Sequence, residues 1–583
     1  MTGSLAAIAA LLVALTGCEA SSGADARQPD LWWPSYGGTY ANTRHADLAQ
    51  IGPKNVAALR LAWKFDTGVY GSFETSPVVV DGVMYFTTGP DNGAYALDAA
   101  TGEVKWHYVP KLGRAPYTFN VNRGVAVDGG SVFFTTLDDR LIALDAQTGR
   151  PRWDSRVGDP ETGMREDAAP LAWGGLVFVG SAGDEMGVRG SYSAFRQSDG
   201  KLAWRWYAVS PGWEGTFRTT AQGYSLHRDI ARERAALGQY RDAWKNGGGA
   251  IWMTPALSPQ DSTIYLSTGN PAPAFAADRR PGDNLYTDCI VALDARTGKM
   301  KWYYQETPHD VWDYDASSPP ALVDALDASG RQVAAVAEAG KTGWLYIVDR
   351  KTGKLLHVSA PFVPQPHVYH QLSAKGEPIQ PGDLGGAIGP IAYDPSTHAA
   401  FVAGDVQPET GTTLPLATWQ PGMSDQWTGG NMTEVPSVHG AGTLTAIDTD
   451  TGRVRWSSPV PNLVFGGPLS TNGLVFLGEQ EAGTFKAYDA ATGSVLWQVT
   501  PGDAVLSHFD LHDRAQQFIS SVDVGIKRLV HRVRHEADYS FEDIHAPPIA
   551  YRIKGREYIV IASNVYQRPT RPGGNTIFAF ALP

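Results

Sequence analysis

The sequence predicts an all-β fold, an eight-bladed β-propeller whose last blade is closed by an N-terminal strand. Three observations lead to this prediction. One hairpin pattern recurs seven times, short strand-like runs precede its copies, and the two ends of the chain hold complementary parts of one further unit. Repeats of this kind are typical of radial architectures in which each repeat forms one sheet.

The recurring hairpin is well illustrated by ALDAATGEVKW at 96–106. An apolar strand end leads to Asp, and a turn ending in Gly supplies the backbone freedom that a tight hairpin needs. A second strand follows, and it carries Trp in six of the seven copies. The copies lie at 96–106, 143–153, 194–204, 292–302, 347–356, 446–456 and 487–497.

Further short strands lie upstream of the hairpins, as in SPVVVDGVMYFTT (76–88). Each unit therefore has about four strands, the number in a propeller blade. The last unit is divided between the termini: 546–564 and 576–582 supply three strands, and LRLAWKFDTG (59–68) supplies the fourth. Pairing the two ends would close the ring and remove its open edges.

We therefore expect one propeller domain over 32–583. Four stretches interrupt its rhythm, near 207–249, 357–386, 404–440 and 503–545. They fall between units or between second and third strands, so we expect them on the face opposite the Gly hairpins. Insertions gathered on one rim usually build a binding surface.

The N-terminus resembles a lipoprotein signal. Residues 1–17 contain an apolar run too short for a comfortable membrane span, and LTGC places Cys18 at the expected lipidation position, followed by a polar tether over 18–31. We expect export to the cell envelope or periplasm with a lipid anchor in a membrane. The alternative is an ordinary cleaved signal in which Cys18 is incidental.

Composition narrows the partners and the redox chemistry. A net charge of -12 and the lack of long Lys or Arg runs argue against nucleic-acid binding. Apart from Cys18 the only cysteine is Cys289, in a strand-like run, so we expect a small buried hydrophobe and no internal disulfide.

Four polar stretches have residues that a simple scaffold does not need. They are GSAGDEMGVRG (180–190) with Glu185, GGGAIWMTPA (247–256) with Trp252, LSTGNPAPA (266–274) with Asn270, and TPHDVWDYDA (307–316) with Asp313 and Asp315. Together they offer carboxylate and amide oxygens for a hard cation, and a flat aromatic surface for a planar ligand.

Taken singly, these residues also have structural interpretations. Trp252 alone is more often a core residue, and Asn270 alone is more often a strand-end cap. Asp310 in Thr-Pro-His-Asp is expected to shape a turn, and His309 to pack nearby.

From about residue 32, WWPSYGGTYANTRHADLAQIGPKNVAALRLAWKFDTG and the four stretches in this order resemble the quinoprotein alcohol dehydrogenases, which bind pyrroloquinoline quinone (PQQ) in an eight-bladed propeller. The resemblance implies that Glu185 and Asn270 coordinate a metal ion, that Trp252 stacks on the quinone, and that Asp313 is the general base and a further metal ligand.

The resemblance also implies quinone contacts for Glu74 in SFETSP, Arg123 in NRG and Lys341 in GKTG. These three could instead form a structural ion-pair group. In the family a second aspartate two positions after the base resembles the mark of lanthanide-using members, and here it is Asp315. Three carboxylates around one ion favour a lanthanide(III) ion over Ca²⁺.

Several positions depart from the family pattern. Tyr117 and Thr118 stand where the family has an adjacent cysteine pair, so that disulfide lid cannot form. The family's polar or aromatic positions near the quinone fall on Asp167, Ala250, Ala387, Ile388 and Phe465. These changes leave the metal ligands and the base in place.

The resemblance implies PQQ-dependent oxidation of an alcohol to an aldehyde or ketone. A metal-polarised quinone carbonyl would accept hydride while Asp313 takes the hydroxyl proton. Electrons would leave to a separate acceptor, because the sequence has no CxxCH haem motif. The alternative is a non-catalytic propeller, similar to the lipoprotein propeller of the outer-membrane barrel-assembly machinery, that acts as an envelope scaffold.

Overall fold

The protein is described by a computed structural model that covers most of the chain. The described residues are 29–113, 120–211, 215–420, 423, 425–436, 438–480, 483–501, 542–565 and 574–583. The predicted signal peptide, Cys18, the altered pair Tyr117 and Thr118 and most of the insertion near 503–545 lie outside this part of the chain.

Short antiparallel strands form seven four-stranded sheets, six of them built from four consecutive strands and one from β23, β24, β27 and β28. The first four comprise β2 (Val78–Val80), β3 (Val83–Thr87), β4 (Ala94–Asp98), β5 (Val104–Tyr108); β6 (Ala126–Asp128), β7 (Ser131–Thr136), β8 (Arg140–Asp145), β9 (Pro151–Arg156); β10 (Leu171–Trp173), β11 (Leu176–Gly180), β12 (Ser191–Arg196), β13 (Leu202–Tyr207); and β14 (Ala256–Ser258), β15 (Thr263–Ser267), β16 (Cys289–Asp294), β17 (Met300–Gln305). The next three comprise β18 (Ala321–Leu326), β19 (Gln332–Ala339), β20 (Leu345–Asp349), β21 (Leu355–Val358); β23 (Ala392–Asp394), β24 (Ala399–Val406), β27 (Ala441–Asp448), β28 (Val454–Val460); and β29 (Leu469–Thr471), β30 (Leu474–Gly478), β31 (Phe485–Asp489), β32 (Val495–Val499).

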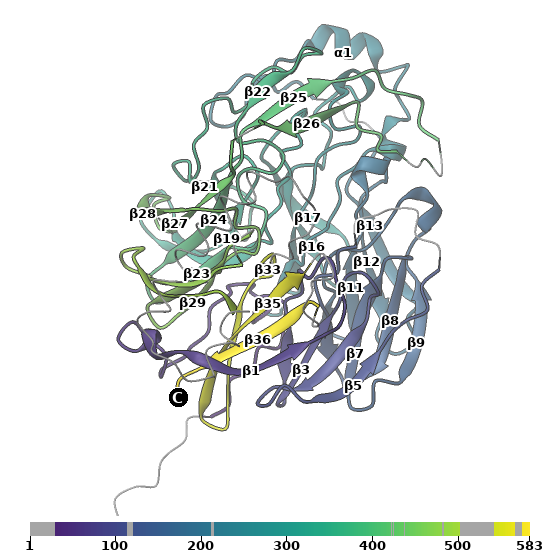
Figure 1. Ribbon diagram of the computed structural model, residues 1–583. Helices are drawn as coiled ribbons and strands as arrows, with labels where there is room; N and C mark the ends of the chain where they lie inside the picture. The colour runs from purple at the N-terminus through teal and green to yellow at the C-terminus, as the bar shows by residue number, and fades with distance from the viewer. Residues whose placement is uncertain are drawn as a thin grey trace, which may run out of the picture.

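A further sheet joins the two ends of the chain (Figure 1). Its strands are β1 (Arg60–Asp66), β33 (Glu542–Asp543), β34 (Ile549–Ile553), β35 (Arg556–Val565) and β36 (Thr576–Ala581). Strand β1 pairs antiparallel with β36, and β36 pairs with β35. The pairing that the sequence predicts between the termini is therefore present.

One contact between neighbouring sheets recurs through the structure. The hairpin glycine of one sheet lies against the tryptophan of the sheet before it, so a Cβ on Gly298 would stand 2.5 Å from the ring of Trp204. The indole N–H of Trp204 donates to the carbonyl of Ala295, three residues before that glycine, at 3.1 Å. Trp106, Trp153, Trp302 and Trp456 make the same pair of contacts. The Gly and Trp of the repeat thus join neighbouring sheets at five junctions, whereas Gly452 meets His357 at the junction of the β18–β21 and β23–β28 sheets.

The sheet that joins the termini uses a variant of this contact. Trp63 of β1 lies against Gly102 of the first sheet, but its indole nitrogen has no hydrogen-bond partner. The corresponding carbonyl, that of Ala99, accepts instead from the hydroxyl of Tyr551 at 2.7 Å. The indole of Trp63 thus occupies the same position as the other tryptophans, but the hydrogen-bond donor is Tyr551 of β34.

The segment before β1 runs across the first strands of the sheets. Backbone hydrogen bonds or a tyrosine hydroxyl link residues 31–44 to seven sheets in turn, through Val79, Ala172, Leu257, Leu322, Tyr393, Ser470 and Arg552. Buried Arg44 lies in this segment and donates to the carbonyls of Tyr36 and Pro548 at 2.8 and 2.6 Å. The segment therefore fixes the sheets relative to one another.

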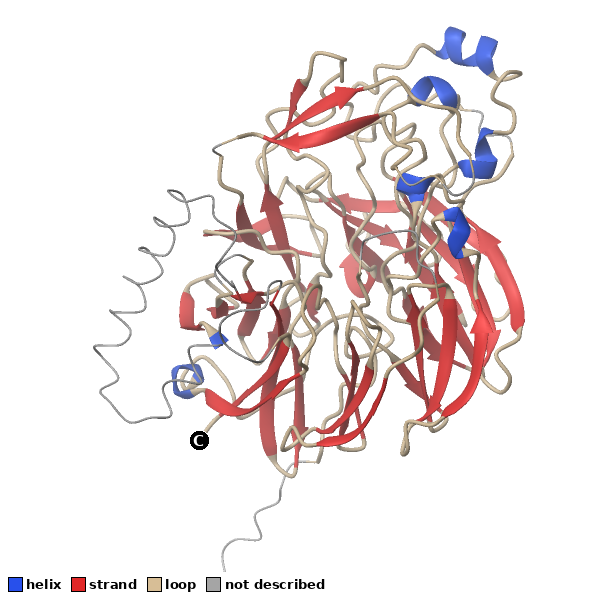
Figure 2. Ribbon diagram, turned by 45° about the vertical axis from the view of Figure 1, so that its right-hand side comes forward, coloured by secondary structure: helices blue, strands red, loops and turns tan. Residues whose placement is uncertain are grey.

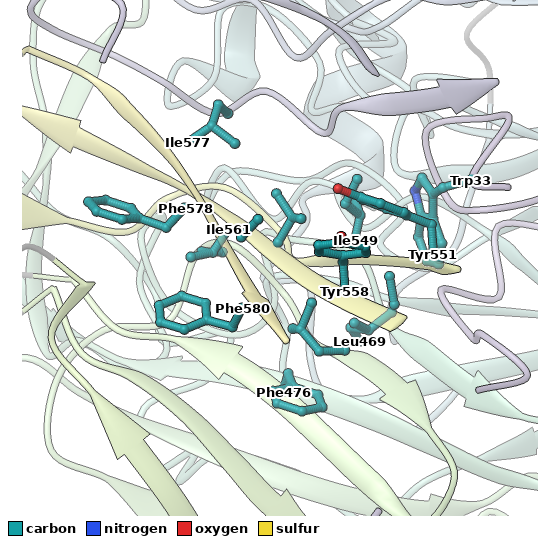
Figure 3. Packing of buried hydrophobic residues seen from close by; sticks show 14 of the residues in the cluster. Trp33, Leu469, Phe476, Ile549, Tyr551, Tyr558, Ile561, Ile577, Phe578 and Phe580 are labelled. Carbon is teal, nitrogen blue, oxygen red and sulfur yellow. The ribbon is translucent and has the colours of Figure 1, made fainter. Parts of the chain in front are cut away.

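A hydrophobic core holds this segment against the sheet of the termini. Trp33 packs near Tyr551 and Tyr558, while Phe578 and Phe580 extend from β36 toward the neighbouring sheet (Figure 3). The burial of these aromatic side chains provides much of the favourable free energy at this junction.

The insertions near 207–249, 357–386 and 404–440 gather at one end of the molecule (Figures 1 and 2). There the strands β22 (Glu377–Ile379), β25 (Glu409–Thr413) and β26 (Gly430–Glu434) form a three-stranded sheet near the helix α1 (Ile230–Ala236). Within the described residues, no helix has the length and apolar character needed to cross a membrane.

The contact between hairpin glycine and tryptophan predicts a position-dependent cost of adding a methyl group. Gly298→Ala should destabilise the fold by about 1–3 kcal/mol more than Gly330→Ala. Both glycines have positive φ, +69° and +78°, but only Gly298 faces an indole, since a Cβ on Gly330 meets nothing within 4 Å. Urea unfolding of the two variants measures the difference, and equal midpoints would contradict the proposed contact.

Candidate active site

A central pocket of about 240 Å³ collects every residue that the sequence assigns to the metal, the quinone and the base. None of these residues lies in a strand, and they come from seven separate connecting segments within or between the sheets. Its lining includes Glu74, Arg123, Glu185, Trp252, Asn270, Asp313, Asp315 and Lys341.

Glu185 lies in a single 3-10 turn, Asp184–Met186, between Gly183 and Gly187, which both have positive φ. Such backbone angles are accessible to glycine at little cost, so the turn can present two adjacent carboxylates. The insertion 404–440 supports the turn, because the amide of Trp427 donates to the carbonyl of Glu185 at 2.6 Å.

Arg123 links the aromatic and acidic sides of the pocket. Its guanidinium lies 5.2 Å from the ring centroid of Trp252 and donates to the carbonyl of Trp252 at 3.2 Å. It also forms an ion pair with Glu74 at 2.7 Å. The guanidinium therefore fixes the ring and the carboxylate together, so the ion-pair alternative and a ligand-binding role are compatible.

Asn270 and Asp315 are joined directly. The backbone amide of Asn270 donates to Oδ1 of Asp315 at 2.5 Å, and the Asn270 side chain donates to the carbonyl of Pro271 at 3.2 Å. The Asn270 side-chain oxygen is left available as a neutral oxygen ligand, close to a buried carboxylate.

Asp310 shapes the loop that presents Asp313. Its two carboxylate oxygens each accept a backbone N–H at 2.9 Å, from Trp312 and Tyr314. Both aromatic side chains are fully buried, and Asp313 between them has φ +64°. Because Asp tolerates this left-handed conformation better than most residues, the loop can turn Asp313 toward the pocket.

Lys341 is the cation nearest the proposed base. Its Nζ lies 3.2 Å from Asp313 and 3.0 Å from Asp315. Burial, opposed by Lys341 and reinforced by Asp315, raises the pKa of Asp313 well above its ordinary value. Burial and the charges of Glu185 and Asp315 likewise raise the pKa of Asp184. The pocket therefore holds more negative charge than its own cations neutralise.

The residues fit a hard cation and a planar anionic cofactor. The carboxylates of Glu185, Asp313 and Asp315 and the amide oxygen of Asn270 are oxygen ligands, and Glu185 Oε2 is buried without a hydrogen-bond partner. Among the described residues, no three His, Cys, Asp or Glu side chains lie close enough together to form a complete metal site by themselves. Lys341 instead lies between two of the carboxylates.

Sequence reasoning missed several residues that line the same pocket. These are Tyr36, Arg165, Asp184, Asp383 and His545. Asp184 directly precedes Glu185, so its place in the glycine-flanked turn was a usable signal. Asp383 follows the inserted strand β22, and His545 is the last residue of the insertion near 503–545. In both places no repeat pattern indicates the direction of a side chain.

The altered family positions also lie at or beside this pocket. Asp167 and Phe465 line it, and Asp167 accepts from Nε of Arg165 at 3.0 Å. Ile388 is a further lining residue, whereas Ala250 and Ala387 are buried. Of these three apolar residues, only Ile388 therefore faces the pocket.

Fold and pocket together define a class, the cofactor-binding β-propeller oxidoreductases. A family model described as "Glucose/ethanol/alcohol dehydrogenase, beta-propeller domain" matches residues 33–384. The chain therefore belongs to the quinoprotein, PQQ-dependent alcohol dehydrogenase family, whose enzymes act on CH–OH donors. A second model, "Outer membrane protein assembly factor BamB", matches only residues 400–511.

Curated relatives support this membership. Quinohemoprotein alcohol dehydrogenase ADH IIB of Pseudomonas putida is 36% identical over 490 residues, which are 80% of this chain and 69% of the relative. The lanthanide-dependent methanol dehydrogenase of Methylorubrum extorquens is 32% identical over 521 residues, covering 82% and 85% of the two chains.

Solved structures show the same all-β propeller fold. Quinohemoprotein alcohol dehydrogenase from Comamonas testosteroni superposes with a TM-score of 0.76 at 29% identity, covering 96% of this chain and 81% of that one. A europium-containing methanol dehydrogenase has a TM-score of 0.76 at 27% identity, covering 94% and 98% of the two chains.

The two hydrogen bonds to Asp310 predict that this carboxylate stabilises the loop. Asp310→Ala should lower the free energy of unfolding by about 2–3 kcal/mol, because two buried amides lose their acceptor. Asp310→Asn keeps one acceptor oxygen and should recover about half of the loss. Urea unfolding measures both variants, and an unchanged midpoint for Asp310→Ala would show that the loop does not need the carboxylate.

Proposed function

We propose that this protein oxidises an alcohol to an aldehyde or ketone by hydride transfer, with Asp313 as the general base. The observation that carries the proposal is the convergence of Asp313 with Glu185, Asn270 and Trp252 in one pocket. These residues come from separate loops, and their meeting has no evident role in joining the sheets.

We propose that Glu185, Asn270, Asp313 and Asp315 hold one metal ion. The second aspartate, Asp315, favours a lanthanide(III) ion over Ca²⁺, since a trivalent charge balances the carboxylates better. The names of relatives that are lanthanide-dependent or europium-containing support the same preference. In the absence of such an ion, Lys341 offsets part of this negative charge.

We propose that Trp252 supports one face of PQQ, while Glu74, Arg123 and Lys341 contact its polar edge. When bound, PQQ supplies a carbonyl that accepts hydride, and the metal ion supplies a Lewis acid. Arg123 already holds Trp252 and Glu74 in fixed relation, so the planar surface is preorganised.

Asp313 is placed to take the proton of the substrate hydroxyl at a carboxylate oxygen. The loop tied by Asp310 fixes its direction, and Lys341 at 3.2 Å favours its ionised form against the effect of burial. A carboxylate held within hydrogen-bond reach of the hydroxyl is the general base that this oxidation needs.

At the level of the whole chain, we propose that the eight sheets are the blades of one closed ring forming a single domain over 32–583. We further propose export through the signal over 1–17, a lipid anchor at Cys18 and a separate electron acceptor. The pairing of β1 with β36 supports the closed ring, and the lack of a CxxCH motif supports a separate acceptor. The apolar run that ends in LTGC at Cys18 supports export and the anchor.

A non-catalytic envelope scaffold is the second candidate. Its support is the match of residues 400–511 to the assembly-factor model. A scaffold has no need for several carboxylates and a buried lysine converging on one pocket, because the burial of charged groups costs free energy. The dehydrogenase is therefore the better explanation of the site.

The proposed base predicts a selective loss of turnover. Protein reconstituted with PQQ and either La³⁺ or Ca²⁺ should reduce an electron-accepting dye in the presence of an alcohol. Asp313→Asn should lower kcat by about 10²–10⁴-fold, the usual contribution of a general base. Bound PQQ, measured by absorbance after gel filtration, should show whether cofactor binding survives the change. No alcohol-dependent reduction by the wild type with either metal would reject the enzyme assignment.

The proposed trivalent site predicts that Asp315 governs metal choice. Asp315→Ala should weaken Tb³⁺ binding by at least about tenfold, because one anionic oxygen ligand is lost. Sensitised Tb³⁺ luminescence measures binding without turnover, and La³⁺-dependent dye reduction should fall with it. Equal Ca²⁺-dependent activity in the wild type and the variant, with no advantage of La³⁺ in either, would refute the assignment.

A further inference from the structure

A tight turn places Asp383 in the pocket. The amide of Gly385 donates to the carbonyl of Gly382 at 3.1 Å, so Asp383 and Leu384 occupy the tip of the turn. Both residues line the same pocket as Asp313. The turn directly follows the inserted strand β22 and is not part of the repeating hairpins.

The turn is tied to the elements that carry the proposed base and its lysine. The hydroxyl of Tyr314, the residue after Asp313, donates to the carbonyl of Pro381 at 2.8 Å. On the other side, a Cβ on Gly386 would stand 2.2 Å from the carbonyl oxygen of Lys341. Asp383 therefore has a defined position beside the reacting end of the pocket.

Glu409 supports the turn from β25. It is 2% exposed, and a Cβ on Gly382 would stand 1.5 Å from its Oε2. Burial, followed by the charge and hydrogen bond of Asp383, raises the pKa of Glu409 to about 9. At neutral pH Glu409 therefore keeps its proton and adds no negative charge beside Asp383.

The charge of the pocket indicates what this carboxylate would bind. Its lining holds seven carboxylates, against three lysine or arginine side chains. A trivalent metal ion and a tricarboxylate cofactor would add nearly compensating charges, so an excess of negative charge persists. Within the described residues, the ion pairs of Lys341 go to Asp313 and Asp315, and Asp383 interacts with Lys341 only at longer range.

We propose that Asp383 is a substrate-binding residue that selects alcohols carrying an ammonium group, and that Glu409 is its positioning residue. This inference rests on the proposed function, since it assumes that the reacting hydroxyl lies at Asp313. A carboxylate presented on a rigid turn makes a strong charge-assisted hydrogen bond with an ammonium group. The substrate class is therefore the amino alcohols.

The test compares three primary alcohols of similar length: 3-amino-1-propanol, 1,3-propanediol and 1-butanol. With the full chain loaded with PQQ and metal, kcat/KM should be highest for the amino alcohol. Asp383→Asn should lower that value by at least about tenfold and leave 1-butanol within about twofold. A preference for the diol, or an equal loss for all three alcohols, would overturn the ammonium assignment.

The positioning role of Glu409 is tested by measuring whether its substitution changes KM without changing kcat. Glu409→Leu should raise KM for the amino alcohol by several-fold with kcat unchanged, while Glu409→Gln, which retains a hydrogen-bond donor, should restore it. The control is Glu434→Gln, because Glu434 is the exposed cross-strand partner of Glu409 in β26 and should leave every constant unchanged. Loss of 1-butanol oxidation in Glu409→Leu would indicate a merely structural role.

A binding measurement separates this inference from the proposed function. Isothermal titration calorimetry with propylammonium should detect binding to the wild type and at least about tenfold weaker binding to Asp383→Asn. Propylammonium has no hydroxyl, so the result does not depend on turnover. If the wild type oxidises none of the alcohols, the proposed function fails, and the titration still decides whether Asp383 binds a cation. Equal affinity in both proteins would overturn the inference.

Discussion

The contact between a hairpin glycine and the tryptophan of the preceding sheet is the constraint on which the structure depends. In this contact the indole packs against the glycine and also donates one hydrogen bond to a backbone carbonyl of the same hairpin. Together the two interactions fix the distance and the rotation between two sheets. Repetition of the contact spreads this relation around the molecule. Loops that leave successive sheets are then brought to a common centre, where Glu185, Asn270 and Asp313 meet although they lie far apart in the sequence.

Assembly of these loops has an electrostatic cost. Burial raises the pKa of Asp313 and Asp184 because the ionised carboxylates lose solvation and repel their neighbours. Lys341 and Arg165 offset only part of the charge, and Glu185 Oε2 is left without a hydrogen-bond partner. A site with this imbalance is stabilised by a bound cation, which is the physical reason to regard the carboxylates as ligands.

Much of this arrangement could be predicted from the sequence. The repeat with Gly and Trp predicted the sheets and their hairpins, and the terminal runs predicted the pairing of β1 with β36. The family motifs gave residues that the structure collects in one pocket. Asp383 and His545 were missed because they lie in insertions, where the repeat gives no guide. The hydrogen bond from Tyr551, rather than Trp63, to the carbonyl of Ala99 could not be predicted, because it joins strands far apart in the sequence.

The insertions add residues to the pocket that the repeated sheets do not supply. The residues proposed to hold the metal and cofactor come from loops that leave the repeated sheets, whereas Asp383 and Glu409 come from the segments that form the three-stranded sheet. The hydrogen bond from Tyr314 to Pro381 is a direct link between the two parts. A change in the inserted turn can therefore alter the charge that the substrate meets while Asp310 continues to hold Asp313 in place. Substrate choice and the chemistry of oxidation are thus assigned to different segments of the chain.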